Sequence, residues 1–300
     1  MIKERKAHIS DVSKLVECKF IGKDSEIEGL NLVNRRSRYS AVLSYITSEK
    51  YLNTILENPS VVSLIVSEKD YHAIKDVLSA SRDMSYLISG QPELFFYEIH
   101  DLLWEKTEFY NHYNEDPIIG IGCDIHPSAV IESGVVIGNN VQIGPNSVVR
   151  KGSVIDDNVI IGCCTVIGSE GFQGIKGFNK CVKHVGRTHI CHDVYVGDNS
   201  TIGNALFEGE TRVGAYSKID NHVHFAHNCI CGEGCFITAS SLLMGSTILK
   251  DNVWMAPNAV TYNGVVVENN SFVGTMTLAK ANVGEGEVVA GIPAKVLRKK

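Results

Sequence analysis

The sequence predicts a mainly β protein, in which a long solenoid of short strands follows a small α/β domain. From Ile125 onward an aliphatic residue recurs every six positions, and glycine often follows it directly, as at Gly138 and Gly144. A period of six fits neither an amphipathic helix nor a simple alternating strand, but it fits a prism whose flat faces are short strands joined by tight turns. Before residue 115 this period is absent, and runs typical of strands and helices alternate.

The recurring residues predict the interior of the solenoid. Each points inward from a flat face, while glycine or asparagine occupies a corner where the backbone needs positive φ. Stacked coils then bury a continuous apolar column, because each coil contacts its neighbours. The inward positions are Ile125, Ile131, Ile137, Ile143, Val149, Ile155, Ile161, Ile167, Ile190, Val196, Ile202, Val213, Ile219, Phe225, Cys231, Ile237, Leu243, Leu249, Met255, Thr261, Val267 and Val273.

Two interruptions break the period. Residues 171–187 form an excursion, and the step from Ile202 to Val213 is eleven residues, one short of two repeats. Insertions in a repeat protein commonly form its binding face. We therefore expect the excursion either to close over a ligand of a neighbouring subunit or to be an exposed loop without a ligand role.

The first part of the chain is expected to be an α/β domain at residues 1–112, with the solenoid at 117–285 and a basic tail at 286–300. A domain of this length is ordinary. Its expected elements are a helix at 11–17 capped by Ser10, strands at 60–66 and 86–89, a helix at 92–105, and a polar linker at 111–116.

Composition excludes several classes of protein. The 300 residues carry a formal net charge of −6, which argues against a nucleic-acid-binding surface. No stretch approaches the ~18–20 apolar residues of a membrane span, and the charged start leads into no apolar signal core. The nine cysteines have no paired CxxC spacing, so neither a zinc ribbon nor a disulfide framework is indicated. We expect a cytoplasmic protein.

Three segments narrow the family. They are Ile167-Gly-Ser-Glu-Gly-Phe172, Ile219-Asp-Asn-His-Val-His-Phe-Ala-His-Asn228 and Leu43-Ser-Tyr-Ile-Thr-Ser-Glu-Lys-Tyr51. Together they resemble the UDP-3-O-(3-hydroxyacyl)glucosamine N-acyltransferase family of the hexapeptide-repeat acyltransferases, over nearly the whole chain. The resemblance implies a left-handed parallel β-helix (hexapeptide repeat) preceded by a small uridine-binding-like α/β domain. It also implies a homotrimer without a bound metal or cofactor.

The resemblance further implies the reaction. An acyl group passes from a thioester, of coenzyme A or of acyl carrier protein, to the amino group of a nucleotide-linked amino sugar, in lipopolysaccharide or surface-glycan biosynthesis. Two departures favour a divergent relative: Ser48 replaces the family's asparagine, and the Gly291-Ile-Pro-Ala-Lys295 ending resembles that of acyltransferases that use coenzyme A. The alternative is the lipid A biosynthesis enzyme itself.

The predicted catalytic residues are His227, Glu210 and Gly245. His227 occupies the family's catalytic position, and histidine suits a general base for an attacking amine. One coil back, Glu210 is the candidate for orienting its ring, or else a solvated acidic turn. Gly245, one coil of eighteen residues beyond His227, is a candidate for an oxyanion-binding backbone N–H.

The predicted binding residues fall into two groups. Tyr45 and Tyr51 could stack on a pyrimidine base, or be ordinary core tyrosines. At the basic C-terminus, Lys295 and Arg298 could meet the phosphates of coenzyme A, or belong to a frayed end. The remaining substrate-binding residues that the resemblance implies are Ser48, Glu170, Gly171, Phe172 and Asn228.

Two other classes of protein remain open. His222 and His227 have the spacing of zinc ligands in γ-class carbonic anhydrases, but that family's third histidine falls where this chain has Gly186. A non-catalytic, sugar-binding solenoid is the third class, because a fold does not fix a function.

Overall fold

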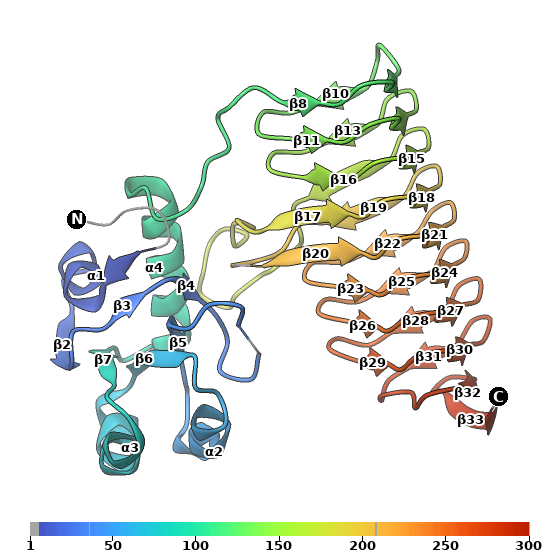
Figure 1. Ribbon diagram of the computed structural model, residues 1–300. Helices are drawn as coiled ribbons and strands as arrows, with labels where there is room; N and C mark the ends of the chain where they lie inside the picture. The colour runs from blue at the N-terminus through green and yellow to red at the C-terminus, as the bar shows by residue number, and fades with distance from the viewer. Residues whose placement is uncertain (1–5, 36, 208, 300) are drawn as a thin grey trace. The chain divides into compact units, whose positions relative to one another are not determined.

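The computed structural model describes residues 6–35, 37–207 and 209–299, which form two compact units (Figure 1). The first unit comprises the chain up to His112 together with Phe172–Val185. The second comprises Tyr113–Gly171 and the chain from Gly186 onward. The excursion of the solenoid is therefore part of the first unit.

A five-stranded sheet forms the centre of the first unit, in the order β2-β7-β6-β5-β4. It is parallel apart from β2, which runs antiparallel to β7. The strands are β2 Lys19–Gly22, β4 Gly29–Leu30, β5 Val42–Tyr45, β6 Val61–Val66 and β7 Ser85–Ile88, and β1 Ala7–His8 pairs separately with β3 Glu26–Ile27. The helices are α1 Ile9–Leu15, the 3-10 helix η1 Glu49–Tyr51, α2 Leu52–Leu56, α3 Glu68–Ser81 and α4 Pro92–Lys106.

Most elements expected in this unit are confirmed, since β6, β7 and α4 lie where the sequence predicts them. The start of α1 is different. This helix begins at Ile9, and Ser10 does not cap it, because the backbone N–H and the hydroxyl of Ser10 both donate to the carboxylate of Asp24.

The second unit is a prism of three sheets, whose strands are parallel apart from the last strand of one sheet. Sheet I contains β8 Ile118–Ile119, β11 Val136–Ile137, β14 Val154–Ile155, β17 Arg187–Ile190, β20 Glu210–Val213, β23 Ile230–Cys231, β26 Ile248–Leu249 and β29 Val266–Val267. Sheet II contains β9 Asp124–Ile125, β12 Gln142–Ile143, β15 Ile160–Ile161, β18 Tyr195–Val196, β21 Lys218–Ile219, β24 Phe236–Ile237, β27 Trp254–Met255, β30 Phe272–Val273, β32 Glu287–Ala290 and β33 Lys295–Lys299. Sheet III contains β10 Val130–Ile131, β13 Val148–Val149, β16 Val166–Ser169, β19 Thr201–Gly203, β22 His224–Phe225, β25 Leu242–Leu243, β28 Val260–Thr261 and β31 Leu278–Ala279.

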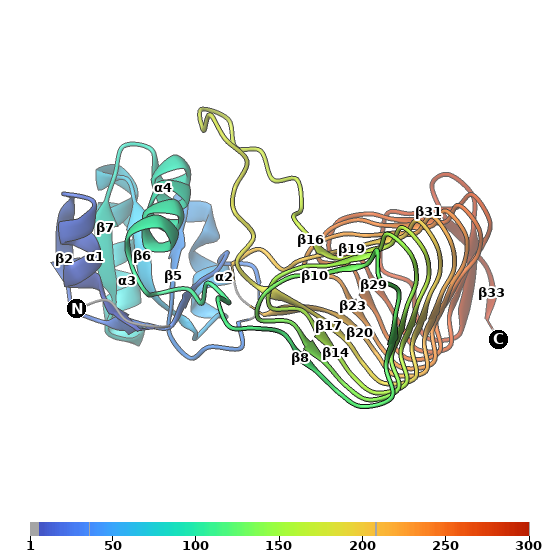
Figure 2. The same cartoon turned by 90° about the horizontal axis from the view of Figure 1, so that it is seen from above.

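The prism is a left-handed parallel β-helix. Each coil visits sheets I, II and III in turn, and in Figure 2 the chain runs counter-clockwise while it recedes from the viewer. General crossover rules favour the right hand. Here the strands are very short and joined by tight corners, many of which hold a residue with positive φ, such as Asn140 at 56° and Asn252 at 56°.

The predicted apolar column is confirmed. Its members from Ile137 to Val273 are at most 2% exposed, whereas Ile125 and Ile131, near the first coil, are partly buried against it. Burying a side chain of this size stabilises the fold by about 1.5–3 kcal/mol. Side chains of the next coil also hold the corners, since the Asp251 carboxylate accepts the backbone N–H of Glu233 at 2.9 Å.

The pair Leu242 and Leu243 tests this column. Leu243 is 0% exposed inside the prism and Leu242 faces outward. We expect Leu243→Ala to lower the free energy of unfolding by about 2–5 kcal/mol, because it leaves a cavity between coils. Urea unfolding measures this, with Leu242→Ala as the matched control. An equal cost for both variants would contradict the inward register.

One expectation needs correction. Residues 287–299 are not a tail: β32 and β33 continue sheet II as a hairpin. In the expected linker, Tyr113 packs against Gly134 and Gly152, where an added Cβ atom would lie 2.5 Å and 2.6 Å from the Tyr113 side chain. The excursion is held by α4, because the carbonyl of Lys183 lies 2.8 Å from His100 Nε2.

Candidate active site

His227 lies at the corner between β22 of sheet III and β23 of sheet I. The coil ladder fixes its backbone, because its carbonyl accepts the N–H of Ser246 at 2.9 Å. On the opposite side, a Cβ atom at Gly203 would lie 3.0 Å from the backbone nitrogen of His227. His227 is therefore stacked between two coils at a position where the neighbouring backbone comes close.

Asn228 orients the imidazole of His227. The Asn228 Oδ1 atom accepts the backbone N–H of Leu206 at 3.0 Å, which identifies it as the carbonyl side of the amide. The same oxygen lies 3.1 Å from His227 Nδ1. Nδ1 must then carry the proton of that hydrogen bond, so Nε2 is the basic nitrogen of the neutral ring. Asn228 itself is fixed by the Thr211 hydroxyl, which accepts its N–H at 2.8 Å.

Gly245 lies directly against the imidazole, one coil beyond His227. A Cβ atom there would be 2.7 Å from both Cε1 and Nε2 of the ring. Only glycine gives the ring this space. Among the described residues no hydrogen-bond partner is found for the Gly245 N–H. The predicted pair of His227 and Gly245 is thus brought together.

Glu210 is not brought to His227, so its predicted orienting role is wrong. Its carboxylate lies 3.1 Å from Arg187 Nη2, 3.7 Å from His189 Nδ1 and 3.5 Å from Arg212 Nη1. The hydrogen bond from His189, with the nearby Arg187 charge, lowers the pKa of Glu210 to about 2. Glu210 is an ionised member of a charged cluster on sheet I, and Asn228 takes the orienting place.

The predicted base-stacking residues lie in the first unit. Tyr45 ends β5, where its hydroxyl donates to Glu93 at 3.0 Å and its ring packs on Phe96 with centroids 5.0 Å apart. Burial raises the pKa of Tyr45. Ser48 caps η1 by accepting the backbone N–H of Lys50 at 3.4 Å, and Tyr51 ends η1. Contact of these three residues with a nucleotide stays a prediction.

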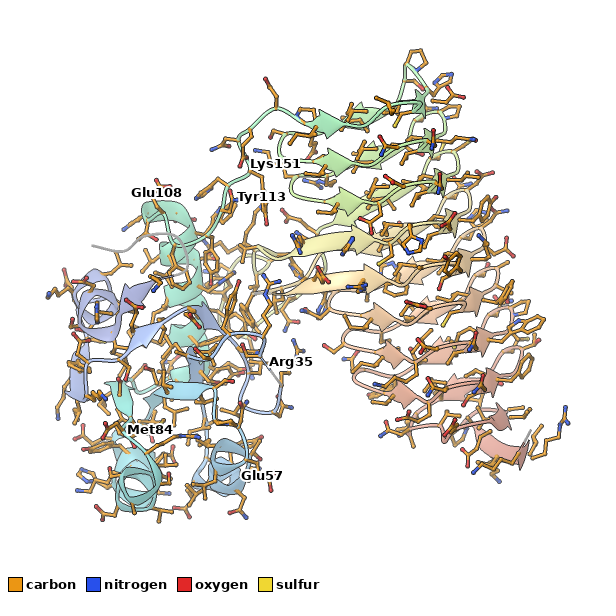
Figure 3. All side chains as sticks on the ribbon, viewed as in Figure 1. Arg35, Glu57, Met84, Glu108, Tyr113 and Lys151 are labelled. Carbon is orange, nitrogen blue, oxygen red and sulfur yellow. The ribbon has the colours of Figure 1, made fainter. Side chains whose placement is uncertain are left out.

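The first unit also contains a pocket of about 560 Å³ that no sequence motif indicates. Arg35 and Glu57, both labelled in Figure 3, line it. Desolvation lowers the pKa of Arg35, and electrostatic interaction with Tyr97 and Tyr45 partly offsets this shift. The available signal was the polar, basic run Asn34-Arg35 after a strand, but it matches no motif.

Other predicted residues belong to other strands and segments than His227. Lys295 and Arg298 belong to β33 of sheet II, whereas His227 is at the corner between sheets III and I. Contact of Lys295 and Arg298 with coenzyme A phosphates stays a prediction. Phe172, with Glu170 and Gly171 before it, has an 85% exposed side chain, and substrate binding by these three residues stays a prediction. His222 occupies a different corner from His227, with φ of 59°.

Comparisons with known proteins agree over most of the chain. Residues 134–169 match the family model described as bacterial transferase hexapeptide (six repeats). The UDP-3-O-acylglucosamine N-acyltransferase of Campylobacter lari is 32% identical over 306 residues, covering 95% of this chain and 92% of that protein. The protein of the same name from a Caulobacter species is 33% identical over 136 residues, and this match spans 40% of its length.

Solved structures are more distant. The UDP-N-acetylglucosamine acyltransferase from Campylobacter jejuni superposes with a TM-score of 0.49 at 20% identity, covering 63% of this chain and 74% of that one. Within the described residues, no helix has both the length and the apolar character needed to cross a membrane.

Proposed function

The chain belongs to the UDP-3-O-acylglucosamine N-acyltransferase family, and on that premise we propose that it transfers an acyl group from a thioester to the amino group of a nucleotide-linked amino sugar. One observation carries the proposal beyond family membership. The imidazole of His227 is oriented by Asn228 and lies against Gly245, within a β-helix corner that the family motif occupies.

The arrangement suits attack of an amine on a thioester carbonyl. His227 Nε2 takes the proton that the amine loses as the carbon–nitrogen bond forms. The Gly245 N–H donates to the oxygen that becomes negative in the tetrahedral intermediate. When the carbon–sulfur bond breaks, the imidazolium returns the proton to the leaving thiolate. The chain's own groups therefore account for every proton in the step.

The remaining parts of the proposal concern partners. The α/β domain at residues 1–112 holds the nucleotide through Tyr45, Ser48 and Tyr51, and the β-helix at 117–285 carries catalysis. The donor is an acyl-coenzyme A or an acyl carrier protein, and the enzyme is a cytoplasmic homotrimer in lipopolysaccharide synthesis. The family resemblance supports these parts, and a UDP-linked 3-O-acylglucosamine is the first acceptor to test.

A turnover assay tests the proposal. We expect an amide product from UDP-3-O-acylglucosamine with an acyl carrier protein donor, or from a dTDP-linked amino sugar with an acyl-coenzyme A. Binding of each ligand is followed in parallel by its effect on the melting temperature, since a ligand of the folded state stabilises it. Binding of a nucleotide sugar without amide formation from either donor would favour the sugar-binding solenoid.

A further inference from the structure

A cluster of chemically active side chains lies on sheet I and is not used in the proposed reaction. Asp156 directly follows β14. One coil further along, His189 lies on β17 and Cys191 directly follows β17. One oxygen, one nitrogen and one sulfur atom from these residues all lie within 4.8 Å of one another. Strand pairing places them together, because Ile155 is in register with Ile190.

His189 has a carboxylate near each of its ring nitrogens. Its Nε2 atom lies 3.0 Å from both carboxylate oxygens of Asp156, and its Nδ1 atom lies 3.7 Å from Glu210. A histidine that binds a metal nearly always gives its other ring N–H to a carboxylate or carbonyl. Glu210 in turn forms an ion pair with Arg187, and this ion pair holds the Glu210 carboxylate beside the His189 ring.

We propose that Asp156, His189 and Cys191 bind one divalent transition-metal ion of the zinc type, with Glu210 as the carboxylate behind His189. The donor set of one oxygen, one nitrogen and one sulfur suits Zn²⁺ or Co²⁺ and not Mg²⁺ or Ca²⁺. Three protein ligands leave a fourth position of the tetrahedron for water or a small ligand.

The surroundings suit this ion. Asp156, one of the three proposed ligands, also lines a pocket of about 440 Å³, together with His192 and others. The ion replaces one proton on His189 and one on Cys191, so the formal charge of the cluster is unchanged and two protons are released. Burial raises the pKa of the Cys191 thiol, and the nearby Arg212 charge acts against this shift and favours the thiolate that binding requires.

This inference does not rest on the proposed function, because the cluster lies on sheet I and needs no acyl transfer. Its test is titration of the chelator-treated, full-length protein with Co²⁺. We expect one equivalent to bind, with visible absorption of a tetrahedral ion and an ultraviolet thiolate-to-cobalt band. Cys191→Ser should abolish the ultraviolet band, and His189→Gln should weaken binding by at least about ten-fold.

Two further variants make the result specific. His192→Gln is the matched control, because His192 hydrogen-bonds to Asp193 and its ring meets that of Tyr216 edge-on, outside the cluster. It should bind Co²⁺ as the unchanged protein does. Glu210→Gln should keep the ultraviolet band while weakening binding by about 10–100-fold, as expected of a residue that positions a ligand.

The proposal fails if no stoichiometric Co²⁺ binds, or if the thiolate band persists in Cys191→Ser, because one of the other cysteines would then be the ligand. Melting curves recorded without metal show whether each variant is folded. If Cys191→Ser does not fold, Asp156→Asn replaces it, and unchanged Co²⁺ affinity in that variant also overturns the proposal.

Discussion

His227→Ala is expected to lower turnover by about 10²–10⁴-fold, the range that a positioned general base contributes. The reason is local: the ring nitrogen opposite the Asn228 contact is the one that receives the amine proton. Nucleotide-sugar binding should be retained, because the predicted base-stacking residues lie in the other unit. Steady-state kinetics with the acceptor and donor that give product in the turnover assay measure kcat, and thermal stabilisation measures binding.

His222→Asn is the matched control for that variant. His222 lies at another corner of the same coil with φ of 59°, and asparagine tolerates this conformation while removing the imidazole. It should change turnover by less than about two-fold. If His227→Ala itself stays within about two-fold of the unchanged enzyme, His227 is not the base. A comparable loss in both variants would indicate a role for the histidine pair, as the zinc alternative requires.

The coil architecture was predictable because it follows directly from the period. Three faces of six residues make one coil, so residues eighteen apart lie one above the other. His227 and Gly245 have this separation, and the ring and the glycine do meet. The same arithmetic placed Leu243 inside the prism. Wherever the period is unbroken, counting along the sequence predicts which residues point inward and which residues stack in neighbouring coils.

Counting failed where the period breaks. The eleven-residue step before Val213 does not reveal at which corner the missing residue was lost. In the structure, β20 pairs with β17 over four residues, and this pairing sets Glu210 beside Arg187 instead of His227. The orienting role of Asn228 was also hidden, because it depends on the Leu206 backbone across that irregular coil.

Contacts between distant segments were equally inaccessible. The excursion is held to α4 by ion pairs from Lys180 to Asp101 and Glu105, which lie 79 and 75 residues earlier. The final strand, β33, pairs antiparallel with β32, although its basic residues suggested a frayed end. No local pattern marks either contact, because neither depends on a repeat.

Gly245→Ala is expected to reduce turnover by about 10²–10³-fold, because it displaces the imidazole that acts as the general base. An alanine Cβ atom would lie 2.7 Å from Cε1 and Nε2 of His227, so the ring must leave its place. Gly174→Ala is the control, because nothing lies within 4 Å of the Cβ position there. The control should retain turnover.

The double variant His227→Ala/Gly245→Ala separates two effects of the alanine at residue 245: its clash with the His227 ring and any disturbance of the oxyanion site. Without the imidazole the Cβ atom meets no ring, and the backbone N–H of residue 245 is still present. The two substitutions therefore act on one interaction, and their effects should not add. We expect the double variant to turn over at the rate of His227→Ala alone. A further loss of more than about ten-fold would mean that alanine disturbs the oxyanion site itself, independently of the ring.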